Sequence, residues 1–332
     1  MAPPFEPRLE LETPDVSVVV PVYRSAEILP RLAEETERVL VAAGHEGRME
    51  LILVCDASPD DSWQVIQQLA MVMPWVHGVL LRKNAGQHNA TMAGLARARG
   101  SRIVVMDDDL QHPPSAIPML LAELDRGYDV CYTRYRNRQH ALWKRVGSKL
   151  NDIVATLLLK KPRGLYLSSF KAMDRAIVRE IVKYDGPYAY LDGLILDVTR
   201  RMAVVEIDHA PRASGAGNYN LRRSVSLWLK MATSFSVYPL RLILAVGSLL
   251  ALFSLVAVVC LIVIKLLHPS VAAGWTSLIA TVLLVGGVQL IGLGLIGEYL
   301  GRAYLKLNRK PQYVVRETTE RLPETTSAPR AG

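Results

Sequence analysis

The chain has 332 residues and a formal net charge of +8, and half of its residues are hydrophobic. This length suits one globular domain with an appendage, because single cores stop growing beyond about 250 to 300 residues. The positive charge gathers at 134–149 and 200–241, beside the most apolar part of the chain. We therefore expect membrane lipid, and no nucleic acid, as the partner of these basic segments.

Residues 1–15 form an N-terminal extension without the apolar core of a signal peptide. We expect the globular part to stay on the side of the membrane where it is made. That side is reducing, and Cys55, Cys131 and Cys260 lack the spacing of a metal motif. Disulfides and zinc are therefore not expected.

Short β-branched runs alternate with helical patterns from residue 16 onward. The strand-like runs are 16–20, 50–54, 76–81, 103–106 and 129–132. This alternation predicts an α/β domain, which we place at 16–220. Ligands of such sheets bind beyond the carboxyl ends of the strands, so the residues that follow each strand form the candidate site.

Candidate nucleotide ligands follow the second and third runs. Asp56, in CDASPDD, lies at a strand end and can accept a hydrogen bond from a nucleotide base, although a turn or capping role stays open. Arg82 and Lys83 offer charge to a diphosphate, and Gly86 lets the backbone come close to it. Neither a Rossmann fingerprint nor a P-loop is present, so the nucleotide is held in another way.

Three adjacent carboxylates, Asp107, Asp108 and Asp109, follow the fourth run in VVMDDDLQHPP. Such charges repel one another unless a cation holds them, and a hard divalent ion prefers oxygen ligands. Asp107 and Asp109 project to the same side of an extended chain, so both can reach one ion. A solvated turn is the alternative, but the preceding apolar strand and the following prolines favour a site for Mg²⁺ or Mn²⁺.

Two uncharged runs of 23 residues, Leu242–Ile264 and Trp275–Gly297, match the roughly 20 residues that cross a bilayer. We assign transmembrane helices to 241–266 and 275–299; a pair of buried core helices is the alternative. The pattern at 221–240 predicts a juxtamembrane amphipathic helix. A further apolar face, at 139–159, fits either an interfacial helix or an ordinary surface helix.

Basic residues flank the two uncharged runs, whereas the loop between them holds only Lys265 and His268. The positive-inside rule then places the catalytic domain and both termini in the cytoplasm. We expect 300–332 to be a cytoplasmic C-terminal segment, with 316–332 disordered. Small residues on the second run would allow close packing, within the chain or in a homo-oligomer: Gly286, Gly287, Gly292, Gly294, Gly297 and Gly301.

Together these motifs resemble the family 2 glycosyltransferases of GT-A fold, over about 16–312. Within that family they are similar to the polyprenyl-phosphate glycosyltransferases: bactoprenol glucosyltransferases, undecaprenyl-phosphate aminoarabinose transferases and dolichol-phosphate mannose synthases. The likeness is carried by VVVPVYRSAE, CDAS and MDDDLQHPP. NAGQHNATMAGL, RNRQHALWKRVGSK and LIGLGLIGEYLGR look closest to the aminoarabinose and bactoprenol branch.

The resemblance implies a site at the strand ends, with Asp107 and Asp109 on the metal and Asp109 catalytic. The nucleotide-sugar is expected at Pro21, Tyr23, Glu27, Asp56, Arg82, Lys83, Gly86 and Asp107. The lipid phosphate is expected at Arg136, Arg138, Arg212 and Tyr219, the last two within RASGAGNY. These arginines would alternatively bind only bulk anionic lipid.

Several positions depart from the family pattern. Arg24 stands at the usual Asn, and Cys55 and Ala57 replace Asp and Gly in the family's Asp-Asp-Gly-Ser. In GLYLSSFKAM, Leu165 stands at the expected catalytic acid and Lys171 at an Arg.

Asp192, in YAYLDGL, is the nearest acid to offer as a base in place of the missing one, and a structural role for it stays open.

The implied activity is an inverting transfer of a sugar from a nucleotide-sugar, with a UDP-sugar favoured, to polyprenyl (undecaprenyl) phosphate at the bacterial inner membrane. A phosphate monoester is largely dianionic at pH 7, so the absence of an acid at Leu165 is tolerable. The alternative is a catalytically inactive, membrane-bound scaffold that binds nucleotide-sugars. A processive polysaccharide synthase would need a Gln-x-x-Arg-Trp motif, which the chain lacks.

Overall fold

The computed structural model describes most of the N-terminal half and selected later parts of the chain. The described residues are 13–135, 165–186, 189–207, 274–307 and 311–319, with scattered positions between 244 and 267. They divide into two compact units, one holding the sheet with its helices and the other holding helix α10.

The first unit is built on an eight-stranded sheet of order β7-β5-β6-β4-β1-β2-β3-β8. Four neighbouring strands are parallel: β1 (Val16–Val22), β2 (Met49–Cys55), β3 (Val76–Leu81) and β4 (Arg102–Val105). The others are β5 (Val130–Tyr135), β6 (Lys171–Asp174), β7 (Met202–Ile207) and β8 (Val315–Thr318). β6 runs antiparallel to β4 and β5, and β8 antiparallel to β3. The predicted α/β fold is confirmed, and the five predicted runs correspond to β1 to β5, while the bounds 16–220 stay a prediction.

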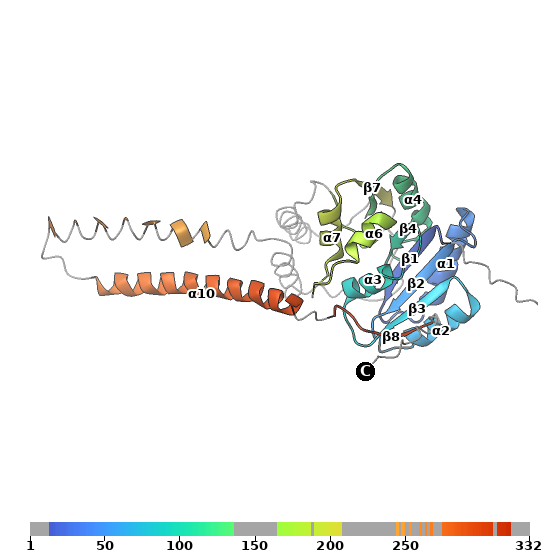
Figure 1. Cartoon of the computed structure of the whole chain (residues 1–332), viewed down its shortest axis with the longest axis horizontal. Coiled ribbons are helices and arrows are strands. Elements are labelled where there is room, and N and C mark those ends of the chain that lie inside the picture. Colours follow the sequence, from blue (N-terminus) through green and yellow to red (C-terminus); the bar gives the residue numbers. More distant parts are fainter. Residues whose placement is uncertain are drawn as a thin grey trace, which may run out of the picture. The chain divides into compact units, whose positions relative to one another are not determined.

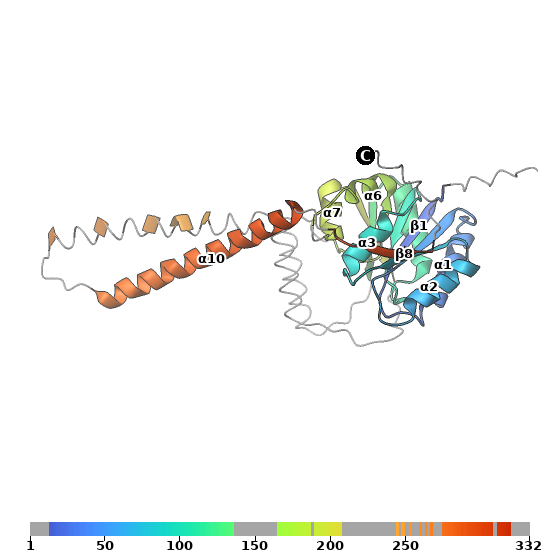
Figure 2. The ribbon, with the colours of Figure 1, turned by 60° about the horizontal axis from the view of Figure 1, so that its bottom comes forward.

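Helices cover both faces of this sheet (Figures 1 and 2). They are α1 (Leu29–Ala42), α2 (Ser62–Val72), α3 (Gln87–Leu95), the short 3-10 helix η1 (Pro114–Ala116), α4 (Ile117–Asp125), α6 (Arg175–Ile181) and α7 (Leu191–Val198). Alternate residues of β1 separate the two layers. Val18 and Val20 belong to the core under α1, α2 and α4, whereas Val19 faces α3. At that contact a Cβ on Gly94 would lie 2.4 Å from Val19 Cγ1, so glycine allows α3 to approach the sheet closely.

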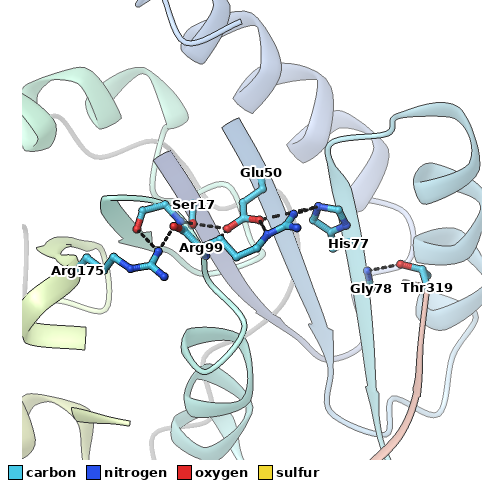
Figure 3. A network of polar contacts seen from close by, with 8 residues as sticks. Ser17, Glu50, His77, Gly78, Arg99, Arg175 and Thr319 are labelled. Atoms are coloured by element: carbon cyan, nitrogen blue, oxygen red, sulfur yellow. Dashed lines mark hydrogen bonds and ion pairs between the residues drawn. The ribbon is translucent and has the colours of Figure 1, made fainter. Parts of the chain in front are cut away.

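A polar network closes the amino-terminal edge of the parallel strands (Figure 3). The buried carboxylate of Glu50 accepts hydrogen bonds from Ser17 Oγ and from the backbone N–H and Nε of Arg99, at 2.6 and 3.0 Å for the latter two. Arg175 donates to the carbonyls of Arg99 and Gly100. Because buried charges are stable only when paired, this network fixes the start of β1, β2 and β4.

The segment after α10 returns to the sheet and pairs with β3. Thr318 of β8 lies opposite Val79 of β3, and Arg82 N–H donates to the carbonyl of Val314 at 2.8 Å. Gln312 Nε2 donates to two carbonyls in the segment that follows α6, those of Tyr184 and Gly186. The expectation that 316–332 is disordered is therefore wrong for 316–319, because β3 offers this polar segment an open edge to pair with.

The second unit contains α10 (Trp275–Leu307), within which Leu284–Gly301 has a mean hydropathy of 1.4. By length and composition, α10 is the one helix among the described residues that could cross a membrane. It includes the predicted span 275–299. Most of the predicted span 241–266 lies outside the described residues, and its described positions are helical. The helix predicted at 221–240 also lies outside them.

Candidate active site

Four loops meet at the carboxyl edge of the parallel strands, where ligands of open α/β sheets bind. They follow β1, β2, β3 and β4, and they carry Tyr23, Asp56, Arg82 and Asp107 respectively. Hydrogen bonds between side chains of one loop and the backbone of the next hold them together, as the following contacts show.

Asp56 fixes the loop between β3 and α3. Its two carboxylate oxygens accept hydrogen bonds from the backbone N–H groups of Ala85 and Gly86, at 2.6 and 2.8 Å. Gly86 has φ +85°, a conformation that glycine adopts without strain, and it is the N-cap of α3. A carboxylate oxygen can accept a second hydrogen bond, so contact between Asp56 and a nucleotide base stays a prediction.

Asp60 ties the loop after β2 to the loop after β1. Its carboxylate accepts hydrogen bonds from Ser58 and Ser62 and from the backbone N–H of Ala26. Burial raises the pKa of Asp60, but these hydrogen bonds outweigh it and leave the pKa lowered. A turn-stabilising role was the alternative considered for Asp56. Asp60 has such a role, because its carboxylate binds two nearby serines and the backbone of the neighbouring loop.

Three non-glycine residues in these loops have a left-handed backbone: Arg24 (φ 60°), Ala57 (φ 49°) and Leu110 (φ 55°). This conformation costs a residue with a Cβ roughly 1–2 kcal/mol. Arg24 and Ala57 stand where the resembled family has Asn and Gly, the two residue types that tolerate it. The loop geometry therefore explains why the family prefers those residues, and this chain keeps the geometry at a cost.

Asp108 binds the loop after β1. Its Oδ2 accepts hydrogen bonds from Tyr23 N–H at 3.0 Å and from Ser25 Oγ at 2.5 Å. Burial raises the pKa of Asp108, with further increases from the charges of Asp107 and Asp109, while the two hydrogen bonds oppose the rise. Asp108 therefore has a structural partner of its own.

Asp107 is held from two sides. Its Oδ1 accepts a hydrogen bond from Gln87 Nε2, the first residue of α3, at 2.6 Å. Its Oδ2 accepts one from Ser169 Oγ, just before β6, at 2.6 Å, and lies 3.5 Å from His112 Nδ1. Asp109 accepts a hydrogen bond from the backbone N–H two residues further on, at 3.0 Å.

These carboxylates fit a metal that is completed by its substrate. Within the ranges that the structure describes, there is no group of three or more His, Cys, Asp or Glu side chains that could hold a metal ion. Mg²⁺ is commonly bound through one or two carboxylates, with substrate phosphates and water filling the other positions. Asp107 and Asp109 match that donor set, and a fully protein-made cage is not required.

A buried cluster of ionisable side chains lies beneath α7 and beside α3. The ammonium of Lys171 pairs with Asp192, their side chains being 2% and 10% exposed. Tyr132 Oη donates to the same oxygen of Asp192 at 3.1 Å, and its ring lies 4.9 Å from Lys171 Nζ. Tyr190, the N-cap of α7, packs edge-on against His88 with ring centroids 5.2 Å apart.

Burial dominates the ionisation of this cluster. It raises the pKa of Tyr132 and of Tyr190, and the charge of Asp192 raises both further. Burial also lowers the pKa of His88, which favours the neutral imidazole. The sequence offered Asp192 as a catalytic base, with a structural role as the alternative. Its buried ion pair with Lys171 favours the structural role.

The other predicted site residues divide by location. Pro21 is buried in β1, Tyr23 is 45% exposed with the guanidinium of Arg24 5.5 Å from its ring, and Glu27, Arg82 and Lys83 are exposed. Leu165 is buried. Arg136, Arg138, Arg212 and Tyr219 lie outside the described residues. The ligand roles of all these residues stay predictions.

Sequence reasoning missed Gln87 and Ser169, which donate hydrogen bonds to Asp107. It also missed Tyr132, which contacts both members of the buried Lys171–Asp192 pair. For Gln87 a signal exists, since it is a polar residue at the start of the helix that follows β3. Ser169 gives no such signal, because its place depends on how β6 pairs with β4.

The fold and these strand-end carboxylates define a nucleotide-sugar transferase domain of GT-A type. The sequence model of glycosyl transferase family 2 matches residues 17–182, half of the chain. The chain therefore belongs to glycosyl transferase family 2, as the resemblance indicated.

Particular relatives extend this similarity over nearly the whole chain. The undecaprenyl-phosphate 4-deoxy-4-formamido-L-arabinose transferase of Proteus mirabilis (strain HI4320) is 34% identical and covers 91% of this chain and 93% of its own length. The enzyme of the same name from Pseudomonas savastanoi pv. phaseolicola is 35% identical and covers 94% of each chain. The solved structure of glucosyl-3-phosphoglycerate synthase from Mycobacterium tuberculosis is similar with a TM-score of 0.47, at 20% identity over 67% of this chain and 78% of that chain.

Proposed function

We propose that this glycosyltransferase moves a sugar from a nucleotide-sugar, with a UDP-sugar favoured, to undecaprenyl phosphate, and inverts the anomeric carbon. The observation that carries the proposal is the end-to-end similarity to transferases named for undecaprenyl phosphate. The product would be a lipid-phosphate-linked sugar for the cell envelope.

The reaction is a single displacement. An oxygen of the lipid phosphate attacks the anomeric carbon, the bond from that carbon to the diphosphate breaks, and its electron pair leaves with the nucleoside diphosphate. The attacking phosphate monoester is largely dianionic at pH 7, so the protein need not remove a proton from it. Buried Leu165 and the ion-paired Asp192 are compatible with such a mechanism.

Asp107 and Asp109 would hold the Mg²⁺ or Mn²⁺, and the bound ion would neutralise charge on the leaving diphosphate. Arg82 and Lys83, exposed at the end of β3, would contact the same diphosphate. Asp56 keeps their loop in place through the backbone of Ala85 and Gly86. The nucleotide would also contact Pro21, Tyr23 and Glu27, and the lipid phosphate would contact Arg136, Arg138, Arg212 and Tyr219.

The acceptor lipid requires the site to work at a membrane. We propose two transmembrane helices, 241–266 and 275–299, in the bacterial inner membrane, with the catalytic domain and both termini cytoplasmic. The length and composition of α10 and the basic flanks of both runs support this topology. Labelling of single cysteines placed at 270 and at 325 in intact cells would test it, since only position 270 should react with an impermeant reagent.

The activity is tested on full-length protein in detergent with undecaprenyl phosphate, Mg²⁺ or Mn²⁺, and separate UDP- and GDP-sugars. Lipid products are read by mass spectrometry. Asp109→Ala is expected to abolish the product. The matched control is Asp125→Ala, which removes an exposed carboxylate paired with Arg102 at 2.7 Å, near the opposite edge of the sheet, and should leave the rate unchanged.

A sugar-linked lipid phosphate that requires both metal and Asp109 would support the proposal and name the donor. Binding of a nucleotide-sugar without any lipid product, across the whole donor panel, would reject it in favour of the inactive scaffold.

A further inference from the structure

We infer that Gln87 and Ser169 are positioning residues that hold the carboxylate of Asp107 in the orientation that binds the metal. This inference rests on the proposed function, because it assigns a role toward the same metal site.

The first support is the geometry of the two hydrogen bonds. Gln87 Nε2 and Ser169 Oγ each lie 2.6 Å from a different oxygen of Asp107. Hydrogen bonds to an ionised carboxylate are short and strong, and these two approach from separate elements, α3 and the residue before β6. Each oxygen has about two acceptor positions, so Oδ1 keeps one for a cation or its water. Oδ2 has His112 Nδ1 3.5 Å away as well as Ser169 Oγ.

The second support is that Asp107 needs such restraint. The terminal torsion of an aspartate has a broad, roughly two-fold profile, so the carboxylate turns easily unless something holds it. Asp107 also lies in a row of three acids, of which Asp108 is hydrogen-bonded to Tyr23 and Ser25. Two opposed donors therefore fix the plane of a carboxylate that its neighbours repel.

The third support is that residues close in sequence to both donors contact α7. Gln87 precedes His88, whose ring contacts Tyr190 at the N-cap of that helix. Ser169 lies two residues before Lys171, which pairs with Asp192 in the first turn of the same helix. The contacts form a closed ring through α3, α7 and β6 that returns to Asp107.

Loss of either donor should lower the affinity of the site for the metal without unfolding the domain. Removing a hydrogen-bond partner of a metal ligand typically lowers metal affinity or activity 10- to 100-fold. The effect should appear as a higher Mn²⁺ requirement, while the rate at saturating Mn²⁺ changes much less.

The experiment measures Mn²⁺ binding by electron paramagnetic resonance on full-length protein in detergent, with UDP present. The variants are Gln87→Met and Ser169→Ala, with Ser169→Thr to restore a hydroxyl. Two controls remove the same groups elsewhere. Gln67→Met loses an amide hydrogen bond to the carboxylate of Glu317 at 3.0 Å, and Ser101→Ala loses a hydroxyl hydrogen bond to the carbonyl of Asp15 at 3.0 Å.

We expect the Mn²⁺ dissociation constant to rise about 10- to 100-fold in both test variants and to stay within about threefold of wild type in Ser169→Thr and in both controls. The Mn²⁺ concentration for half-maximal transfer should rise in parallel. Unchanged Mn²⁺ binding in Gln87→Met and Ser169→Ala would overturn the inference, even if transfer were lost. Failure of the wild-type protein to bind Mn²⁺ with UDP would overturn the proposed metal site itself.

Discussion

Removal of either partner of the Lys171–Asp192 pair should destabilise the sheet domain strongly. The two side chains are 2% and 10% exposed, so each single substitution leaves a buried charge without its counter-ion. Losses of this kind cost about 3–5 kcal/mol. In Asp192→Asn the new amide still accepts the hydroxyl of Tyr132, so the loss is confined to the ion pair. The double variant Lys171→Met/Asp192→Asn buries no charge and should cost less than the sum of the two single changes.

Thermal unfolding of the full-length protein in detergent, followed by tryptophan fluorescence, measures the effect. In a domain of this size about 1 kcal/mol shifts Tm by roughly 2–4 °C, so each single variant should lose roughly 6–20 °C. The matched control, Lys183→Met, breaks a surface pair with Glu180 and should lose less than about 4 °C. A Tm for Asp192→Asn within 2 °C of wild type, with transfer abolished, would refute the structural role and restore Asp192 as a catalytic base.

Two further substitutions test the backbone of the site. Ala57→Gly should raise stability by about 1 kcal/mol, since the residue has φ 49°, and a Tm that falls would show that the left-handed turn is not strained. Gly94→Ala has two opposed effects: alanine favours the helix by about 1 kcal/mol, whereas its Cβ would lie 2.4 Å from Val19 Cγ1. Overpacking costs about 1–3 kcal/mol, which should exceed the gain in helix propensity, so the Tm of Gly94→Ala should fall. The added change Val19→Ala should recover part of this loss. A raised Tm in Gly94→Ala would contradict the close packing of α3 on β1.

The sequence predicted the strands that obey a simple hydrophobic pattern. β1 and β2 are buried along their whole length, and their sequences, VSVVVPV and MELILVC, are mostly apolar. β6 was missed because it contains Lys171, which a pattern assigns to solvent and the fold buries beside Asp192. β8 was missed because its sequence is polar and its strand conformation depends on pairing with the edge of β3. β7 is a short, mostly apolar run, MAVVEI, that could have been recognised as a strand, and its burial alternates in the structure.

The candidate site was also predictable only in part. The acids after β2 and β4 were predictable, because residues at the ends of parallel strands converge at one edge of the sheet. Their hydrogen-bond partners were not predictable, because Ser169 reaches Asp107 only through the antiparallel insertion of β6 between β4 and β5. Local sequence thus indicated the carboxylates of the site, whereas their hydrogen-bond partners depend on the order of the strands in the sheet.

The place of β8 in the sheet has a consequence for biosynthesis. The strand beside it, β3, ends at Leu81, whereas β8 begins at Val315, beyond the apolar helix α10. Ribosomes add about 5–20 residues per second, so β3 stays without this neighbour for some time after its own synthesis. An open edge of this kind is a site for mispairing between chains. The sheet is completed only after α10 has been made, and a chain that stops at α10 would keep the open edge and become a natural target for quality-control proteases.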